Sequence, residues 1–255
     1  MTFFEAVTLG ALEGVTEFLP ISSTGHLILA SHLLGLEQTA AHKAFEVSIQ
    51  LGSILAVFVL YFQRLVHDRT LWYKLAIAFL PTGILGFLFY KHIKALFGVE
   101  TVSIMLIVGG FVFLIVEWLR RGKSVTAGED LSTLSYKDAL IIGLFQSLSM
   151  VPGTSRSGAT IIGGLIAGLS RKSAAEFSFL LALPTMFIAT GYDLAKHHQE
   201  MAFDDLVMLI SAFVTAFLFA IVTVKAFVAF VGRHTFVPFA IYRIILGVLF
   251  LLIVV

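Results

Sequence analysis

The sequence contains no cysteine, and only 13% of its 255 residues are charged. Without cysteine, disulfide bonds, thiolate metal sites and cysteine nucleophiles are excluded. The formal net charge is only +1, and no basic patch is large enough for nucleic acid, so no nucleic-acid partner is expected. Residues 1–20 lack the lysine or arginine that begins a secretory signal peptide and carry three glutamates, so we expect no cleaved signal.

Apolar residues, in contrast, make up 58% of the chain, and the mean hydropathy is +0.98. Soluble domains are typically about 45–50% apolar and about 25% charged, so this composition predicts an all-α polytopic membrane protein. A helix needs about 20 apolar residues to cross the hydrocarbon core. Six transmembrane helices are expected, at 44–62, 71–90, 101–119, 173–195, 205–231 and 236–255.

Two pairs of helical segments are too short to cross the membrane. Residues 2–18 and 24–35 flank a bend that contains Pro20. Residues 136–151 and 158–169 flank a second bend. Such backbone is stable at membrane depth only where protein buries it or where it faces a wet cavity. We therefore expect two re-entrant helix hairpins in addition to the six transmembrane helices.

The two hairpins belong to an internal repeat. With a shift of 133 positions, Gly10 falls on Gly143, Glu13 on Gln146, Ser22 on Ser155 and Gly25 on Gly158. Each half then has one hairpin and three spans, and because three is odd, the second half must be upside down relative to the first. Such an inverted-topology repeat usually has its site near the membrane midplane. We expect one integral membrane domain, 1–255, with halves 1–121 and 135–255 joined by a polar linker at 122–134.

Lysine and arginine are unevenly distributed between the two predicted sides of the membrane. Four lie on one side, and ten lie on the other: Arg64, Arg69, Lys74, Arg120, Arg121, Lys123, Lys137, Arg171, Lys172 and Arg233. By the positive-inside rule the richer side is cytoplasmic. Both termini and the mouth of the first hairpin are then expected outside, and the second hairpin enters from the cytoplasm.

Two glutamates occupy the first half-helix of the first hairpin. Glu13 and Glu17 are four residues apart, so they lie on one helix face with Cβ atoms about 5–6 Å apart. Two ionised carboxylates so placed repel each other and are costly at membrane depth. Mg²⁺ or Ca²⁺, an arginine, or one shared proton would compensate them. The alternative is that both are solvated near a helix end.

Hydroxyl groups gather at both bends. Ser22, Ser23 and Thr24 precede a half-helix, so at least one of them is expected to act only as a helix cap. A helix N-terminus is also a binding site for phosphate. The second bend, 154–158, offers another such N-terminus together with Arg156, whose guanidinium suits phosphate oxygens.

Three further polar residues have an open interpretation. His26 shares the first bend with the hydroxyls, and it is either a packing residue or a general base, general acid or nucleophile. Gln50 either lines the cavity or reaches the membrane interface. Arg243 lies deep in the last span, where a structural partner is favoured over a catalytic role.

The segments Glu13-Gly-Val-Thr-Glu-Phe-Leu-Pro-Ile-Ser-Ser-Thr-Gly-His26 and Pro152-Gly-Thr-Ser-Arg-Ser-Gly158 resemble the signatures of the bacterial undecaprenyl pyrophosphate phosphatase family of the bacitracin-resistance type. The resemblance covers the whole chain, including the repeat and the number of spans. It implies a hydrolase that removes the terminal phosphate from undecaprenyl pyrophosphate, recycles the lipid carrier for peptidoglycan synthesis and confers bacitracin resistance. The implied catalytic residues are Glu13, Glu17, Ser23, His26 and Arg156, and the implied phosphate-binding residues are Ser22, Thr24, Ser155, Ser157 and Gly158.

The resemblance also implies a location in the bacterial inner membrane, with the active site open to the periplasmic side. The expected partners are the lipid substrate, membrane lipid and, as a further candidate, a second copy of the chain. Glu13 and Glu17 are the candidate ligands of a divalent cation. The attacking group is left open between Ser23, His26 and water. The competing interpretation is a transporter or lipid-carrier flippase, because inverted repeats with broken helices are typical of transporters.

Overall fold

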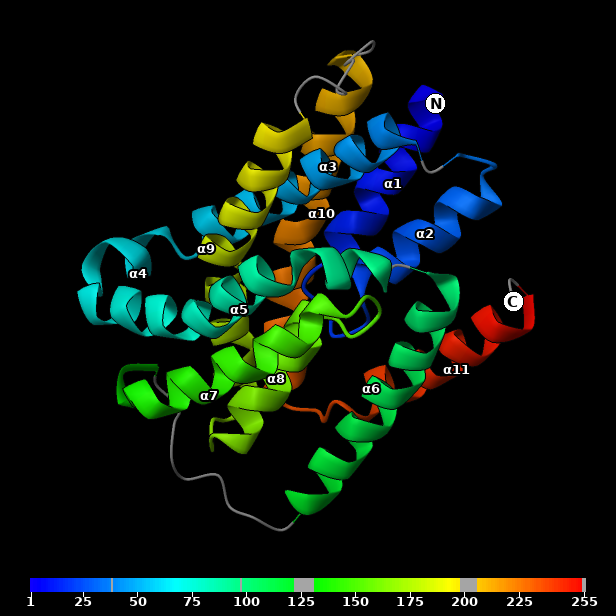
Figure 1. The fold of residues 1–255 in the computed structure, drawn as a ribbon. Coiled ribbons are helices and arrows are strands. Elements are labelled where there is room, and N and C mark those ends of the chain that lie inside the picture. The colour runs from blue at the N-terminus through cyan, green and yellow to red at the C-terminus, as the bar shows by residue number, and fades with distance from the viewer. Residues whose placement is uncertain (38, 97, 122–130, 198–205, 254–255) are drawn as a thin grey trace.

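The computed structural model describes residues 1–255 except 38, 97, 122–130, 198–205 and 254–255. All regular secondary structure in the described residues is helical, as the sequence predicts. The first half contains α1 (Phe3–Thr16), α2 (Ser23–Leu33), α3 (Ala40–Leu60), α4 (Phe62–His67), α5 (Arg69–Ala95) and α6 (Val99–Leu119) (Figure 1). The second half contains α7 (Tyr136–Ser147), α8 (Arg156–Ile166), α9 (Arg171–His197), α10 (Leu206–Val231) and α11 (Val237–Ile253). Short 3₁₀ helices η1 (Leu131–Thr133) and η2 (Leu148–Met150) flank α7, and most of the expected linker, 122–130, lies outside the described residues.

Among the described residues, five helices are long and apolar enough to cross a membrane. They are α3, α5, α6, α9 and α10, and each covers all or nearly all of one expected span; α3 ends at Leu60, two residues before the predicted end at 62. The protein is therefore an all-α polytopic membrane protein. The last expected span corresponds to α11, which has 17 residues and is a shorter apolar helix, so the total of six spans stays a prediction.

The four half-helices lie where the sequence predicts, but each ends two to four residues earlier than expected. A capping box starts α1, because Thr2 Oγ1 accepts a hydrogen bond from Glu5 N and Glu5 Oε2 accepts one from Thr2 N. Ser135 and Asp138 form the same box at the start of α7, and these positions are again related by a shift of 133. Each box satisfies amide groups that the helix itself leaves without partners.

Corresponding helices pack in corresponding pairs. α1 packs along α10, whereas α7, the counterpart of α1, packs along α5. Gly10 on α1 lies against the backbone of Ala212, and Gly143 on α7 lies against the backbone of Ala78. A Cβ atom at either glycine would collide with a main-chain carbonyl, so the absence of a side chain permits both contacts. This pairing supports the internal repeat, while the inverted orientation of the halves stays a prediction.

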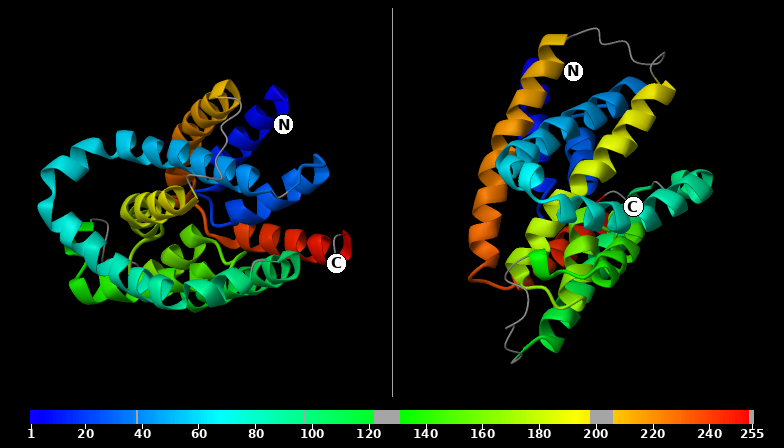
Figure 2. Two further views of the ribbon diagram at one scale, coloured as in Figure 1. Left: turned by 45° about the horizontal axis from the view of Figure 1, so that its top comes forward. Right: turned by 90° about the vertical axis from the view of Figure 1, so that its left-hand side faces the viewer.

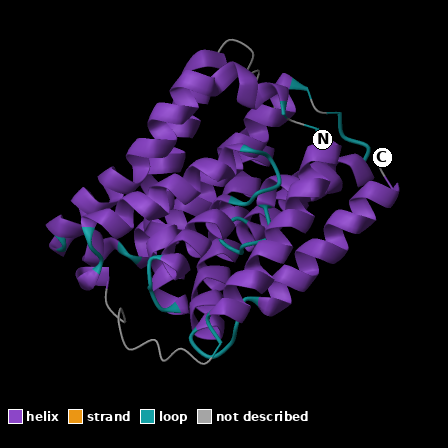
Figure 3. Cartoon of the chain, turned by 60° about the horizontal axis from the view of Figure 1, so that its bottom comes forward, coloured by secondary structure: helices purple, strands orange, loops and turns teal. Residues whose placement is uncertain are grey.

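The long helices enclose the two bends. Figure 2 shows α3 and α5, joined through α4, on either side of α9, and both contact α9. The largest buried apolar cluster includes the fully buried Phe177 and Phe179 of α9. Figure 3 shows loop segments in the middle of the molecule, surrounded by helices. The bends between α1 and α2 and between η2 and α8 therefore meet inside the protein, where protein groups must satisfy their backbone.

Candidate active site

The two bends have the same unusual backbone conformation. Ser22 and Ser155 each have a φ of 71°, and they are the only non-glycine residues with positive φ in the described part of the chain. Such a conformation costs about 1–3 kcal/mol and persists only where surrounding structure enforces it. Each serine immediately precedes a half-helix, α2 or α8. The repeat therefore extends from sequence to the detailed shape of the two bends.

Arg243 of α11 connects the two bends. Its side chain is fully buried, and its guanidinium donates hydrogen bonds to the carbonyls of Pro20 (3.0 Å), Gly153 (3.1 Å) and Thr154 (3.0 Å). It also donates to two carbonyls of α6, those of Met105 and Leu106, at 3.1 and 3.3 Å. The predicted structural role of Arg243 is confirmed, since it supplies hydrogen-bond donors to the three bend carbonyls, which lie outside the helices.

An ion pair joins the two halves at the centre. Arg156 Nη2 lies 2.7 Å from Glu17 Oε1, across 139 positions of sequence. The other carboxylate oxygen, Oε2, accepts a short hydrogen bond from Ser23 Oγ. Arg156 Nη1 donates to the carbonyl of Ser178 at 3.1 Å, and its guanidinium lies 5.7 Å from the ring centre of Phe18. The structure thus brings the predicted acidic and cationic side chains together.

A pocket of about 190 Å³ opens beside this ion pair. Six of the predicted site residues line it: Glu17, Ser22, Ser23, Thr24, Ser155 and Arg156. Gln50 of α3 also lines the pocket, so of its two interpretations the one that places it in the cavity is correct. Ser149, Met150 and Met186 line the pocket too, although the sequence analysis did not single them out. Met186 also approaches Arg156, with Sδ 3.4 Å from Nη2. One water molecule occupies about 30 Å³ in the liquid, so the pocket is larger than several waters and has room for a phosphate group.

Four predicted site residues lie outside the lining of this pocket. His26 is held by two contacts: Nδ1 lies 2.8 Å from the carbonyl of Ser22, and Nε2 lies 2.6 Å from the hydroxyl of Tyr242. Ser157 donates to the carbonyl of Leu19 at 2.8 Å and so ties the two bends together. The other two are Glu13, which is fully buried, and Gly158, whose amide is bound by Ser155.

The two bends differ in how their helices are capped. Ser155 Oγ accepts a hydrogen bond from the amide of Gly158 at 3.1 Å and caps α8. Ser22, the N-cap residue of α2, makes no such bond, and the hydroxyl of Ser23 is bound to Glu17 instead. At least one of Ser22, Ser23 and Thr24 is expected to act only as a cap of α2, and neither serine does so. Amides in the first turn of α2 have no intrahelical partner, so they are available to an anion.

Glu13 has no hydrogen-bond partner for either carboxylate oxygen in the described residues. Its counterpart in the repeat, Gln146, is satisfied: the amide donates to Thr82 at 3.0 Å and accepts from Thr185 at 3.1 Å. Thr82 lies one turn after Ala78, the residue that Gly143 contacts. One turn after Ala212, the residue that Gly10 contacts, α10 has Ala216, which offers no side-chain hydrogen-bond donor. A buried carboxylate without a partner needs a cation or a proton.

The donor groups are carboxylate oxygens, which both Mg²⁺ and Ca²⁺ prefer as ligands. No cluster of three or more His, Asp or Glu side chains able to hold a metal occurs among the described residues. Mg²⁺ needs no such cluster, because it is commonly held by one or two carboxylates together with substrate phosphates and water. Glu13 and Glu17, one helical turn apart and partly without partners, meet this requirement.

These features define the class of the site. It is a polar, arginine-containing anion pocket built from two bends inside a helical membrane protein. The family model described as bacitracin resistance protein BacA matches residues 6–249, and the chain belongs to this family.

Three proteins that match this chain over nearly its whole length share one name. The chain is 60% identical over 251 residues to a protein of Wolinella succinogenes, with 98% of each chain covered. It is also 60% identical over 254 residues to a protein of Persephonella marina, with 100% of each covered, and 53% identical over 259 residues to one of Campylobacter fetus, with 99% covered. All three relatives are named undecaprenyl-diphosphatase.

Proposed function

We propose that this protein is an undecaprenyl-diphosphatase, an enzyme that hydrolyses undecaprenyl pyrophosphate to undecaprenyl phosphate and inorganic phosphate. The full-length relatives of that name support the reaction. The observation in the structure that carries the proposal is the ion pair of Glu17 and Arg156 with Ser23, in a pocket lined by hydroxyls. Undecaprenyl phosphate, the product, is the lipid carrier for peptidoglycan synthesis. The reaction consumes undecaprenyl pyrophosphate, the lipid that bacitracin sequesters, and so confers resistance.

In this mechanism the pyrophosphate enters the pocket while the isoprenoid tail remains among apolar helices. Arg156 turns its guanidinium from Glu17 to the phosphate oxygens, where fixed positive charge stabilises the transferring phosphoryl group. The free amides at the start of α2 bind the same group through hydrogen bonds. Thr24 and Ser155, which line the pocket, supply further hydroxyl donors.

Ser23 is our proposed attacking group, because its hydroxyl lines the pocket and donates to the carboxylate of Glu17. Its oxygen forms a bond to the terminal phosphorus as the bond to the bridging oxygen breaks, Glu17 accepts the proton, and undecaprenyl phosphate leaves. Water then hydrolyses the phosphoserine. His26 is a weaker candidate, since it does not line the pocket and both of its ring nitrogens are engaged, Nδ1 with the carbonyl of Ser22 and Nε2 with the hydroxyl of Tyr242. Phosphate found on Ser23 after an early acid quench would support this order; its absence would favour direct attack by water.

The function is tested by phosphate release from undecaprenyl pyrophosphate, using purified protein in detergent. We expect release by the wild type and at least about a 100-fold lower rate for Glu17→Gln, because the charge opposite Arg156 and the acceptor for Ser23 are both lost. Unchanged melting would show that the variant is folded. A transporter or flippase without hydrolase activity would release no phosphate, since detergent leaves no second compartment.

We also propose that Glu13 and Glu17 hold a divalent cation, Mg²⁺ or Ca²⁺. Such an ion would compensate the unpartnered carboxylate of Glu13 and neutralise charge on the pyrophosphate. Excess chelator is expected to abolish phosphate release, and added Mg²⁺ or Ca²⁺ to restore it. Binding of Mn²⁺ as a paramagnetic probe gives a second readout, which should weaken in Glu13→Gln. Full activity in excess chelator would contradict the metal proposal and would leave one proton shared by Glu13 and Glu17 as the group that offsets their charge.

The proposed location is the bacterial inner membrane, with the polar pocket open to the periplasmic side. The ten-to-four distribution of basic residues supports this orientation. A substrate left in the outer leaflet after polymer assembly would then reach the pocket directly. A homodimer stays a prediction.

A further inference from the structure

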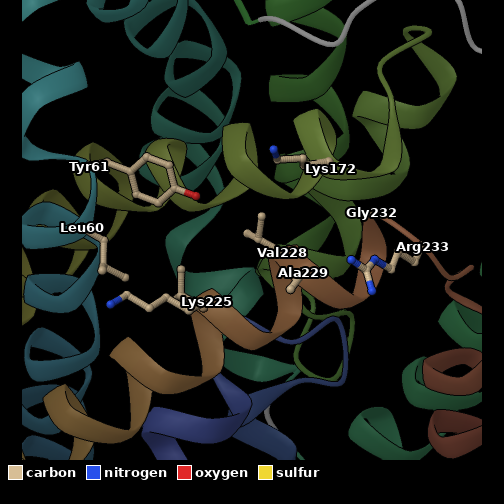
Figure 4. A pocket seen from close by; sticks show the side chains of 9 residues that line it. Leu60, Tyr61, Lys172, Lys225, Val228, Ala229, Gly232 and Arg233 are labelled. Carbon is tan, nitrogen blue, oxygen red and sulfur yellow. The ribbon is translucent and has the colours of Figure 1, made fainter.

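A second pocket, of about 600 Å³, lies away from the proposed active site and shares no lining residue with it. The end of α3, the start of α9 and the end of α10 meet there. Its lining consists of Leu60, Tyr61, Lys172, Val224, Lys225, Val228, Ala229, Gly232 and Arg233. Figure 4 shows Tyr61, Lys172 and Lys225 on three separate ribbons around Val228. These helix ends belong to the side that the basic residues predict to be cytoplasmic.

The charges in this pocket have one sign. Lys172, Lys225 and Arg233 line it, and no acidic residue does. No side-chain hydrogen bond or ion pair of these three cations occurs within the described residues. The acidic group nearest in sequence, Glu176, lies one turn after Lys172 and is paired with Arg64 at 3.6 Å.

Two arginines of the same predicted side have partners in the protein. Arg171, next to Lys172, binds Glu117 through Nε at 2.9 Å and Nη2 at 2.5 Å. Arg120 donates to the carbonyls of Leu165 and Leu169. Lys172, Lys225 and Arg233 differ from these two arginines, and three like charges around one cavity favour an anion as its occupant.

The remaining lining is apolar and extends into the membrane. Leu60, Val224, Val228 and Ala229 form this part, and three of them lie on α10. Lys225 lies six residues before the end of α10 at Val231, about 9 Å along the helix axis at 1.5 Å per residue, and Arg233 follows that end. The cations thus extend from the helix end towards the hydrocarbon region, next to an apolar wall. An amphiphile with a charged head and an acyl chain matches both parts.

We propose that this pocket binds the phosphate headgroup of an anionic diacyl phospholipid from the cytoplasmic leaflet, with an acyl chain along α10. Arg233 and Lys172 bind the phosphate oxygens near the helix ends, and the flexible chain of Lys225 reaches up to the same group. The hydroxyl of Tyr61 is a further donor, and burial raises its pKa, so it stays protonated. Basic pockets between transmembrane helices on this side are suited to such headgroups. The proposal does not depend on the hydrolase activity.

The test compares lipid binding by full-length protein in detergent, measured by native mass spectrometry with phosphatidylglycerol and with phosphatidylcholine. The pocket variant combines Lys172→Gln, Lys225→Gln and Arg233→Gln. A matched control combines Arg69→Gln, Arg121→Gln and Lys137→Gln, which are exposed basic residues of the same predicted side and remove the same charge. We expect the wild type and the control to bind phosphatidylglycerol at least about tenfold more tightly than phosphatidylcholine, and the pocket variant to lose this preference.

Retained phosphate release and an unchanged melting temperature would show that the pocket variant is folded. A preference that survives in the pocket variant, or that is lost equally in the control, would overturn the proposal. Competition distinguishes other sources of the same phosphate chemistry. Displacement of phosphatidylglycerol by millimolar inorganic phosphate, or by an equal amount of undecaprenyl phosphate, would assign the pocket to that ligand instead of a membrane phospholipid.

Discussion

Replacement of Arg156 by lysine is expected to lower kcat/KM for undecaprenyl pyrophosphate at least about 100-fold, although the positive charge is kept. The guanidinium uses two nitrogens in different directions, with Nη2 on Glu17 at 2.7 Å and Nη1 on the carbonyl of Ser178 at 3.1 Å. A single ammonium on a flexible stem cannot make both contacts in the same plane. In the proposed reaction it would also lose the paired hydrogen bonds to phosphate oxygens.

The matched control is Arg64→Lys. Arg64 is also paired with a glutamate, Glu176, at 3.6 Å, but it does not line the polar pocket. We expect this control to retain nearly full phosphate release, measured under the same conditions and after the same purification. Near-normal kcat/KM in Arg156→Lys would remove the planar guanidinium from the mechanism and leave only a requirement for charge.

Replacement of Arg243 by methionine is expected to destabilise the protein and reduce activity, although Arg243 does not line the pocket. The change removes hydrogen bonds to five carbonyls, three of them in the two bends. A buried polar group left without a partner costs about 1–3 kcal/mol, so a total loss of at least about 3 kcal/mol is expected. For about 250 residues this corresponds to a melting temperature lower by about 6 °C or more.

A second variant tests the same contact with the arginine still present. A Cβ atom at Gly109 of α6 would collide with the guanidinium of Arg243, whereas one at Gly191 of α9 would meet no atom within 4 Å. We therefore expect Gly109→Ala to melt lower and to lose phosphate release well below its melting temperature, and Gly191→Ala to behave like the wild type. Normal stability and activity in both Arg243→Met and Gly109→Ala would exclude Arg243 as the residue that positions the bends.

The two halves share a backbone plan but not a chemistry. The capping boxes, the glycine contacts and the positive φ of Ser22 and Ser155 all repeat. Glu13, in contrast, corresponds to Gln146, whose amide is fully engaged by threonines. In the proposed mechanism the first half therefore supplies the carboxylates and the attacking hydroxyl, while the second supplies the arginine. The repeat produces two similar bends, and substitutions within it produce one site.

Sequence alone determined the helical membrane architecture, the hairpin positions and most residues of the polar pocket. These features are encoded locally, since apolar run length decides whether a helix can cross the membrane and proline with hydroxyl groups marks the bends. Glu17, Ser23 and Arg156 were identifiable because polar residues are rare in so apolar a chain. The helix capping of the first bend was not predictable, since Ser22 and Ser155 share φ but differ in ψ, 91° against 116°, and only Ser155 caps.

Only the tertiary structure decided which of these residues meet. Glu17 binds Arg156 across 139 positions, and Arg243 reaches Pro20 across 223, because helices from both halves pack around the bends. The same packing turns His26 towards Tyr242 and leaves the Glu13 carboxylate without a hydrogen-bond partner among the residues that the structure describes. It also gathers three cations from the ends of two helices into a second pocket. Contacts of this kind depend on where distant segments come together, and no local pattern in the sequence specifies that.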